Sequence, residues 1–319
     1  MTVLVLTRQL DPVADLVVAE LNTRGAPVVR LDPGDLPVRG SFTARLGGPE
    51  GWAGVWRGQH RDLHFDTVSA VYWRRPSPSR ATADLPGDVR RWADAESRAG
   101  FRGVLDALPG IWVNHPRVNS AAASTPAALA EAARCGLRVP RSVVTNDPEA
   151  AQEFVASLPG AVAAYKSIGT GGPVTRDGVT YASWTSKVHA EEVTDAVGLS
   201  AHYFSEWIDK AYEVRLTVVG ERLFASEIHA ESEEARIDFR RDYDALTYKT
   251  CQVPDKIETR VLRLMRAFGL RYAALDFLVT QGGEWLLCDV NPNGQFGWID
   301  ELRQPITEAL ADILLGAAP

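Results

Sequence analysis

Hydrophobic and polar positions alternate along two short stretches near the C-terminus, residues 273–279 and 284–291, which a glycine-containing turn separates. Both stretches are rich in strand-forming residues. Gly282-Gly283 can supply the positive φ angles that a two-residue hairpin loop requires. The pattern therefore predicts a β-hairpin with these glycines as its loop.

The predicted hairpin has one apolar face and one polar face. With Gly282-Gly283 as the loop, Asp276 lies opposite Asp289, and Asn291 shares their face because side chains alternate along a strand. Like charges directly opposite each other repel, so the pair indicates a bound cation; a pair of solvated surface acids is the alternative. Oxygen ligands favour Mg²⁺, which takes one or two carboxylates. The other face is expected to be core: Leu275, Phe277, Val279, Leu286, Cys288 and Val290.

The first third of the chain is predicted to be a mixed α/β domain. Residues 2–7 form an apolar run typical of a buried strand, and Asp11-Pro12 supplies the start of a helix that Gly25 ends. No G-x-G-x-x-G follows the first strand, so a dinucleotide site has little support. Further strands are expected at 27–31, between 41 and 66, at 68–73 and at 111–114, with helices over 88–108 and, from alanine content, 121–133.

Two basic residues stand where strands could present them to phosphate. Lys166 ends an apolar strand and precedes the glycine-rich segment 169–173, so an ammonium and free backbone N–H groups lie close together. The residue order is not that of a Walker loop, and a strand-end lysine before a flexible turn is the alternative. Arg215 shares a strand face with Glu213 and Thr217. The forked guanidinium of Arg215 suits phosphoryl oxygens. A simple ion pair with Glu213 is the alternative.

Length and charge exclude several classes of function. The chain has 319 residues, enough for two or three domains, and a formal net charge of −7, which argues against a general nucleic-acid-binding surface. Its three cysteines, Cys135, Cys251 and Cys288, lack zinc-binding spacing and fit a reducing compartment. Residues 2–7 are too short for a signal sequence, and no apolar run approaches transmembrane length. We therefore expect a cytoplasmic protein with neither a nucleic-acid nor a membrane partner.

Asp276 and the segment Cys288-Asp289-Val290-Asn291-Pro292-Asn293-Gly294-Gln295 together resemble the closing segment of ATP-grasp ligases. In that superfamily an Asp, a Glu and the Asn of an E-x-N-P motif hold the Mg²⁺ ions on ATP. The resemblance implies ATP and Mg²⁺ as cofactors, with Asp276, Asp289 and Asn291 as metal ligands. Asp289 stands where Glu is usual, and its shorter arm moves the carboxylate back by about one methylene.

Several further segments, in a matching order and spacing, resemble a narrower family, the ATP-grasp maturases of ribosomal peptides. These are the graspetide synthetases of the microviridin type. The segments are Tyr72-Trp73-Arg74-Arg75-Pro76, Trp112-Val113-Asn114-His115-Pro116, residues 136–148, Ala164-Tyr165-Lys166, residues 210–215, Asp238-Phe239-Arg240 and residues 291–298. Together they cover nearly the whole chain.

This resemblance implies an α/β protein with the ATP-grasp fold: an N-terminal α/β (pre-ATP-grasp) domain, a central α+β lobe and a C-terminal α+β lobe. We expect these at residues 1–116, 117–208 and 209–319. The implied activity is that of a ligase that uses ATP to activate Asp or Glu side chains of a ribosomal precursor peptide, forming ADP and phosphate. The activated groups are then joined to Thr, Ser or Lys side chains as macrocyclic esters or amides. The partner is a precursor with a leader and a core, and a homodimer is left open.

The family also implies roles for individual residues around the nucleotide. Residues 203–210 resemble the segment that hydrogen-bonds adenine between the two grasp lobes, although Ser205 stands where Gln is usual. Core packing is the alternative for Trp207. The implied nucleotide-binding residues are Lys166, Glu206, Trp207, Ile208, Lys210 and Arg215, the last of which is also implied in catalysis.

Asp238 and Arg240 match the D-x-R pattern near the acceptor site of similar enzymes. Alternation along a strand would place both side chains on one face. Arg240 is then expected to hold the substrate carboxylate, and Asp238 to accept a proton from the attacking group. The alternative is an ion pair of Asp238 with Arg236 or Arg241 in a loop.

Two further features follow from the comparison with the family: an unusual residue at the nucleotide site and a candidate leader-binding segment. Thr125 stands where a phosphate-binding Lys is usual, which removes a charge from the nucleotide site. By resemblance alone, the segment from Thr170 to Val188 and the helix after it are expected to bind the leader. Two other functions stay open: a ligase for small carboxylates and amines, and a scaffold in which Thr125 and Asp289 have impaired turnover.

Overall fold

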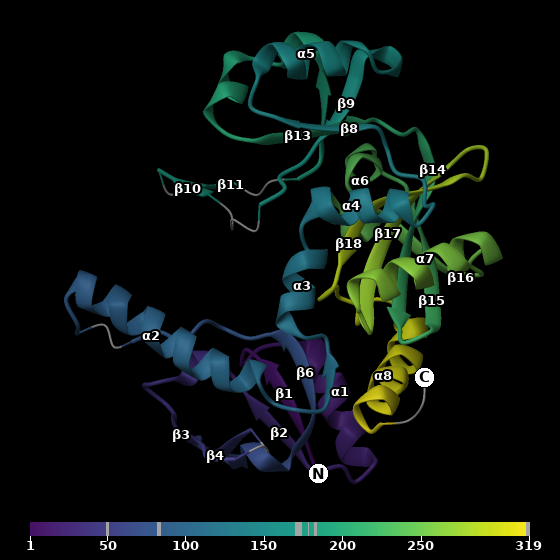
Figure 1. Ribbon diagram of the computed structural model, residues 1–319. Helices are drawn as coiled ribbons and strands as arrows, with labels where there is room; N and C mark the ends of the chain where they lie inside the picture. Colours follow the sequence, from purple (N-terminus) through teal and green to yellow (C-terminus); the bar gives the residue numbers. More distant parts are fainter. Residues whose placement is uncertain (49–50, 82–83, 170–173, 178, 182–183, 317–319) are drawn as a thin grey trace.

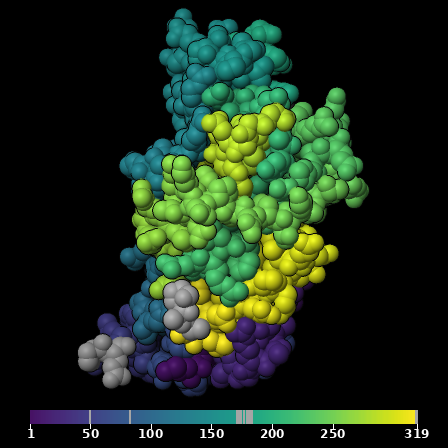
Figure 2. All heavy atoms as spheres, turned by 90° about the vertical axis from the view of Figure 1, so that its right-hand side faces the viewer, coloured from purple at the N-terminus to yellow at the C-terminus, as the bar shows by residue number. Residues whose placement is uncertain are grey.

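The computed structural model describes residues 1–48, 51–81, 84–169, 174–177, 179–181 and 184–316 (Figure 1). Three parts follow one another along the longest dimension of the molecule. Figures 1 and 2 both show the purple N-terminal residues at one end and the teal residues of the middle of the chain at the other. The green and yellow C-terminal residues lie between them, so they contact both ends.

The N-terminal part is built on a parallel sheet with the order β2-β1-β6-β7. The apolar strand β1 is buried at its centre, as the sequence predicted. Asp11 caps the first helix by accepting a hydrogen bond from the Ala14 N–H at 3.3 Å. The elements are β1 (Thr2–Thr7), α1 (Pro12–Thr23), β2 (Val28–Leu31), β6 (Val68–Arg75), α2 (Gly87–Asp106) and β7 (Ile111–Val113), with an antiparallel sheet of β3 (Ser41–Leu46), β4 (Trp52–Arg57) and β5 (Asp62–His64).

Different elements cover the two faces of this sheet. On one face, Leu4 and Leu6 pack with Trp56 of β4 and with Phe101 and Leu105 of α2. The other face packs against α1 and against α8 (Asp300–Leu314), a helix from the far end of the sequence. Buried residues of α8, among them Ile306, Leu310 and Leu314, therefore belong to the same core as β1 and α1.

The predicted helix over residues 121–133 is wrong in its extent, because the structure has two helices there. They are α3 (Pro116–Ala122) and α4 (Thr125–Arg134). Both begin with a proline in the first turn, where the missing N–H costs nothing. In one continuous helix, Pro126 could not donate to the carbonyl of Ala122 and its ring would clash with that group, which explains the break near Ser124. Both helices pack on the C-terminal sheet through Ala122, Ala128 and Ala132.

The middle of the chain folds into a small lobe with an antiparallel sheet, in the order β12-β9-β13-β8. Its core is formed by Ala151 and Val155 of a covering helix and by Ala163 and Phe204 of the sheet. The elements are β8 (Ser142–Thr145), α5 (Pro148–Ala156), β9 (Val162–Tyr165), β12 (Ser186–His189) and β13 (His202–Glu206), with a separate pair of strands, β10 (Val174–Arg176) and β11 (Val179–Tyr181).

The C-terminal lobe is an antiparallel sheet with the order β16-β15-β14-β17-β18. Its apolar face packs against α3, α4 and a strongly amphipathic helix, α7, through residues such as Val214, Leu216 and Leu275. The opposite face carries the polar residues of the candidate site. The elements are β14 (Lys210–Val219), β15 (Arg222–Ala230), α6 (Glu233–Ile237), β16 (Leu246–Cys251), α7 (Asp255–Phe268), β17 (Tyr272–Thr280) and β18 (Trp285–Asn291).

The predicted hairpin is present as β17 and β18, and its register at the site is confirmed. Asp276 pairs with Asp289, and Ala274 pairs with Asn291. The loop is longer than predicted, because the Thr280 N–H bonds to the Glu284 carbonyl and the left-handed Gly283 closes the turn at Thr280. This shifts the outer pairs by one residue. A β-bulge next to Asp276 then restores the predicted register.

The structure differs from the prediction in which residues of β18 face the core. Between the loop and the bulge, alternation on β18 is opposite to the prediction. Trp285 and Leu287 therefore enter the hydrophobic core, whereas Cys288 lines the cleft described below. Leu286, which was expected on the core face with Cys288, is buried but does not belong to that core cluster. Leu275, Phe277, Val279 and Val290 are in the core as predicted.

Within the described residues, the structure contains no helix that is both long and apolar enough to cross a membrane.

Candidate active site

A cleft of about 600 Å³ lies between the middle lobe and the C-terminal sheet. Strand ends from both lobes meet there: β9 and β13 on one side, and β14, β17 and β18 on the other. Every candidate residue from the sequence lines this cleft: Lys166, Glu206, Trp207, Ile208, Lys210, Arg215, Asp238, Arg240, Asp276, Asp289 and Asn291. The structure thus brings together residues that lie far apart in the sequence, from Lys166 to Asn291.

Two carboxylates and an amide from the hairpin form one wall of the cleft. The Asp276 side chain is 15% exposed and that of Asp289 is 40% exposed. Burial raises the pKa of Asp276 to about 6; Arg215 opposes this shift, and the facing Asp289 adds to it. The two acids thus repel each other, as their register requires. Hard oxygen donors on adjacent strands, one of them open to solvent, fit Mg²⁺ with its preference for carboxylates and water.

Lys166 lies directly beside this wall, just after β9. Its Nζ donates a hydrogen bond to the Cys288 carbonyl at 2.7 Å and is 3.9 Å from Asp289 Oδ1. Burial lowers the pKa of the Lys166 ammonium, but the nearby Asp289 and other groups outweigh burial and raise it overall. The lysine therefore stays charged. It can neutralise an anion that enters next to Asp289.

Arg215 and Lys210 come from β14 and have different acidic partners. Arg215 Nε is 3.0 Å from Asp276 Oδ1, whereas Lys210 Nζ pairs with Glu213 at 2.7 Å. The predicted alternative of a simple Arg215–Glu213 pair is therefore not the arrangement found. Among the described residues, the buried Arg215 Nε has no well-aligned hydrogen bond. The Asp276 contact is thus an ion pair rather than a well-aligned hydrogen bond.

Asp238 and Arg240 do not lie on a strand, so that expectation is wrong. Asp238 ends α6 and caps a short 3-10 turn, Phe239–Arg241, where its carboxylate accepts from the Arg240 N–H at 3.1 Å. The sequence Ser232-Glu233-Glu234 supplies an N-cap and an acidic first turn, which favour a helix over a strand. Local capping thus overrides the alternation from which the strand was inferred.

The Asp238–Arg240 pair is nevertheless in the cleft. Asp238 Oδ1 accepts from Arg240 Nε at 2.8 Å and Oδ2 accepts from Nη2 at 2.6 Å, which is a bidentate contact. Oδ2 also accepts from the Thr185 N–H at 3.0 Å. Although burial raises the pKa of Asp238, these hydrogen bonds and the Arg240 charge outweigh it and lower the pKa to about 2. The predicted loop pairing with Arg236 or Arg241 is replaced by pairing with Arg240 itself.

The hinge segment follows β13 directly. Glu206 ends this strand, and its side chain pairs with Arg141 Nε at 3.0 Å. Trp207 is partly exposed in the cleft, and the Lys187 ammonium lies 4.4 Å from the centre of its ring. An aromatic face and backbone groups at the junction of two lobes are suitable for a purine base. This location supports the nucleotide role of Trp207 over the core-packing alternative.

The sequence did not single out three residues that line the cleft: Arg75, Gln295 and Trp298. The Arg215 guanidinium lies 5.6 Å from the Trp298 ring centre, and Trp298 stacks at 6.1 Å on Phe239. Arg75 ends β6 in the N-terminal domain. A signal for it was present, since two consecutive arginines end a buried strand just before a proline, but nothing local indicated that this strand end faces the C-terminal lobe.

Thr125 also lines the cleft, at the first residue of α4. A helix N-terminus favours anions, so Thr125→Lys should add a second favourable charge there. We expect an apparent KM for ATP that is lower by about fivefold, the effect of a partly solvated charge pair. Steady-state kinetics at fixed Mg²⁺ tests this. Ala130→Lys, on the exposed side of the same helix, is the matched control; an equal effect of both variants would show that only net charge matters.

The predicted leader-binding segment is described only in part. Its strands β10 and β11 form an antiparallel pair with Val174 opposite Tyr181. Residues 170–173, 178 and 182–183, which include most of the predicted glycine-rich loop, lie outside the described residues.

The site lies in a cleft between two lobes and contains paired carboxylates, a charged lysine and a hinge segment. This is the arrangement of an ATP-grasp ligase, here preceded by an α/β domain. Residues 2–119 match the family model of the MvdD pre-ATP grasp domain. No curated protein matches the chain. Among solved structures, the chain is similar to a RiPP-associated ATP-grasp ligase from Chryseobacterium gregarium, solved with ADP and a leader and core peptide. The two are 25% identical with a TM-score of 0.92 over 100% of this chain and 97% of that chain.

Two further solved structures agree with this similarity. Macrocyclase MdnC from Microcystis aeruginosa MRC, solved with precursor peptide MdnA, is 25% identical with a TM-score of 0.88 over the whole of both chains. Macrocyclase MdnB from the same source is 26% identical with a TM-score of 0.80 over 99% of each chain. The predicted ATP-grasp fold is thus confirmed, and so is the resemblance to ATP-grasp maturases of ribosomal peptides. The division into lobes at residues 116 and 208 stays a prediction.

Proposed function

We propose that this chain uses ATP and Mg²⁺ to activate Asp or Glu side chains of a ribosomal precursor peptide and joins them to Thr, Ser or Lys side chains. The products are macrocyclic esters or amides. The observation that best supports this is the presence of two arginines, Arg215 and Arg240, beside the paired carboxylates in one cleft. A ligase needs such an additional anion site, because it must hold a carboxylate next to the phosphates of ATP.

The nucleotide is proposed to lie along the cleft with its adenine at the hinge, near Trp207 and Ile208. Lys166 then neutralises phosphate charge at the strand end. When bound, Mg²⁺ supplies charge stabilisation on the phosphates, and the oxygens of Asp276, Asp289 and Asn291 are the groups that would hold it. The guanidinium of Arg215, which lines the cleft, is available to a phosphoryl or acyl oxygen on the same side.

The reaction has two steps on the substrate. A peptide carboxylate, oriented by Arg240 and Arg215, attacks the γ-phosphorus of ATP, so that an acyl phosphate forms and ADP leaves. A hydroxyl or amine of the same peptide then attacks the acyl carbon, phosphate leaves, and the nucleophile loses a proton. Each ring thus removes one water from the peptide overall. The cations stabilise charge on the transferring group without changing position.

Asp238 is better suited to orient Arg240 than to accept this proton, because its pKa is about 2 and both its oxygens already accept hydrogen bonds. We therefore expect Asp238→Asn to slow cyclisation by about 10- to 100-fold, the loss of charge-assisted hydrogen bonds. In the double variant, Arg240→Ala should cause little loss beyond that of Asp238→Asn, because the effects of residues that act as a unit are not additive.

Single-turnover cyclisation, followed by mass spectrometry, measures both variants and their combination. A loss of about 10²–10⁴-fold in Asp238→Asn, together with a mild effect of Arg240→Ala, would instead identify Asp238 as a general base.

The proposed activity is tested with a precursor peptide that carries Thr and Asp or Glu in its core. Incubation with ATP and Mg²⁺ should remove one water per ring, in step with phosphate release. A covalent adduct between a free amino acid and another carboxylate, with no dehydrated peptide, would indicate a small-molecule ligase. Tight peptide binding without phosphate release would indicate a scaffold. Light scattering determines separately whether the chain is a monomer or a homodimer.

A further inference from the structure

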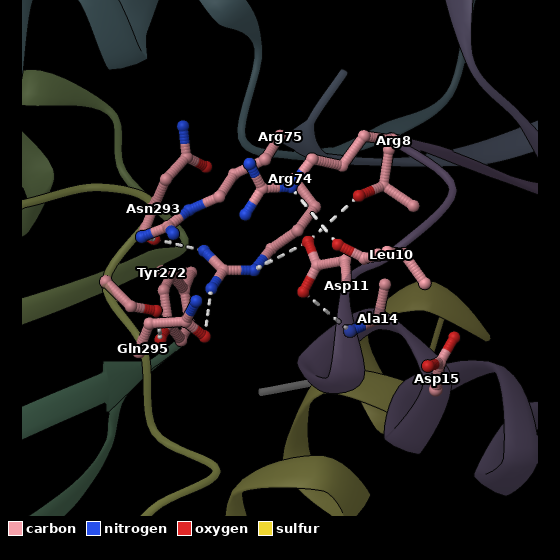
Figure 3. A network of polar contacts seen from close by, with 12 residues as sticks. Arg8, Leu10, Asp11, Ala14, Asp15, Arg74, Arg75, Tyr272, Asn293 and Gln295 are labelled. Atoms are coloured by element: carbon pink, nitrogen blue, oxygen red, sulfur yellow. Dashed lines mark hydrogen bonds and ion pairs between the residues drawn. The ribbon is translucent and has the colours of Figure 1, made fainter. Parts of the chain in front are cut away.

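The N-terminal sheet has a switch point in its strand order, the kind of place where α/β domains usually bind ligands. Its order, β2-β1-β6-β7, means that the chain leaves β1 toward one side and continues with β6 on the other. In open α/β sheets, the carboxyl ends of the strands at such a switch point form the ligand crevice. Here the switch point lies between the ends of β1 and β6. Figure 3 shows Asn293 and Gln295 beside Arg74 at the end of β6, so a loop of the same chain lies at this place.

Arg74, at the end of β6, makes the main contacts with this loop. It is 1% exposed. Its Nη1 donates to the Asn293 carbonyl, and its Nη2 donates to Gln295 Oε1 at 2.8 Å. On the other side, its Nε lies 3.7 Å from Asp11 Oδ2 (Figure 3). The guanidinium therefore joins the start of α1 to the loop that follows β18.

Asp11 is itself held in place, which fixes the position of Arg74. Asp11 Oδ2 accepts from the Thr7 hydroxyl at 2.9 Å, and Oδ1 caps α1 through the Ala14 N–H. A charge pair buried this deeply is weak evidence for stability, because desolvation offsets the attraction. It does specify one geometry, since a buried arginine with rigid partners has few alternatives.

The loop leads directly to the metal end of the cleft. The Asn293 N–H donates to Asn291 Oδ1 at 3.0 Å, so the residue that Arg74 holds also fixes the proposed metal ligand. Three further side chains of the first 119 residues reach the same loop, and one of them, Asn119, donates from Nδ2 to Asn293 Oδ1 at 3.3 Å. Arg75 Nη2 donates to the Asn293 carbonyl at 3.2 Å, and Asn114 Nδ2 donates to the Pro292 carbonyl at 3.2 Å.

We infer that Arg74 is a positioning residue: from the switch point of the N-terminal sheet it holds the 293–295 loop, and through Asn293 it orients Asn291 toward the metal. This inference rests on the proposed metal ligands but not on the peptide substrate. The N-terminal domain, which reaches the cleft through Arg75, thereby also takes part in the chemistry of its metal end. Asn293 is the residue that contacts the proposed ligand directly, and such partners are worth about 10- to 100-fold in metal affinity; Arg74 acts through it.

The test compares nucleotide binding with and without the metal. In the unmodified chain and in Arg74→Lys and Arg74→Gln, calorimetry measures the affinity for ADP with Mg²⁺ and for ADP with a chelator. Both variants should weaken Mg²⁺-ADP binding by about 10-fold or more, while metal-free ADP binding changes by less than about twofold. Lysine keeps the charge but cannot make the two parallel contacts of the guanidinium fork.

Two more variants separate positioning from a general loss of structure. Arg24→Gln removes another contact of the N-terminal domain, the 2.6 Å pair with Asp312 of α8, which lies outside the cleft; it should leave both ADP affinities unchanged. Gln295→Leu removes only the loop acceptor and leaves the Asp11–Arg74 pair intact. It should reproduce part of the Mg²⁺-specific loss even if the Arg74 variants fail to fold.

Three results would overturn the inference: unchanged Mg²⁺-ADP affinity in the folded Arg74 and Gln295 variants, equal losses with and without the metal, or no effect of Mg²⁺ in the unmodified chain. The last result would also remove the proposed metal site. Failure of the peptide activity alone, with Mg²⁺-dependent binding intact, would reject the proposed substrate and leave the role of Arg74 standing.

Discussion

Asp289→Asn is expected to abolish Mg²⁺-dependent ATP turnover, with a loss of at least about 100-fold, while the fold is retained. The substitution removes a hard anionic ligand of the metal. Losing a direct ligand should reduce turnover more than losing a residue that only contacts a ligand. The substitution also removes the charge that faces Asp276 and raises its pKa. It also removes a negative charge that stabilises the Lys166 ammonium. These two effects oppose each other, so at pH 7, without metal, the variant should unfold close to the temperature of the unmodified chain.

Phosphate release measured over a range of Mg²⁺ concentrations tests this expectation, together with thermal unfolding. Asp66→Asn is the matched control, because Asp66 is exposed on the N-terminal domain, away from the cleft. Full turnover of Asp289→Asn at limiting Mg²⁺ would show that Asp289 is not a ligand. A drop in thermal stability would show that Asp289 stabilises the fold instead.

Arg240→Ala should reduce cyclisation by about 10- to 100-fold, the value of charge-assisted hydrogen bonds to a carboxylate, and should change ATP affinity by less than about twofold. The guanidinium is held by Asp238 through Nε and Nη2. Its side chain is still 45% exposed, so the remaining donors can reach a substrate. Without it, the peptide carboxylate is neither neutralised nor oriented, whereas the hinge and Lys166 are unchanged.

Mass spectrometry of the precursor and calorimetry of the nucleotide separate these two effects. Arg241→Ala is the control, because it removes a neighbouring arginine that does not line the cleft. If Arg240→Ala forms rings at the normal rate, Arg240 and Asp238 are a structural ion pair only. If both arginine variants are equally slow, the effect comes from the local charge of the segment.

The metal wall of the cleft could be predicted from the sequence because hairpin pairing is local. Two aspartates near a glycine turn have few possible registers, and the predicted pairing of Asp276 with Asp289 is the one found. That agreement depends on two deviations that cancel, a longer loop and a bulge. Neither leaves a clear signal in the sequence, which explains why the positions of Leu286 and Cys288 were predicted wrongly.

Contacts between distant segments were harder to infer. Arg74 and Arg75 were recognised only as part of a family pattern, since the residues they contact are more than 200 positions away and come together only in the folded chain. Asp238 and Arg240 were assigned to the correct cleft but to the wrong element. Alternation of two residues cannot distinguish a strand from a capped turn, whereas the Asp238 cap can be seen only when its bonding partners are in place.

The packing of α8 has a consequence for synthesis of the protein. Its side chains Ile306, Leu310 and Leu314 complete the core that β1 and α1 begin, although they are translated long after both. As the chain leaves the ribosome, part of one face of the first sheet therefore stays uncovered until α8 has been made. Release of the chain before that point would leave an apolar surface that favours aggregation. The first sheet is made early, but its folding can finish only after α8 has left the ribosome.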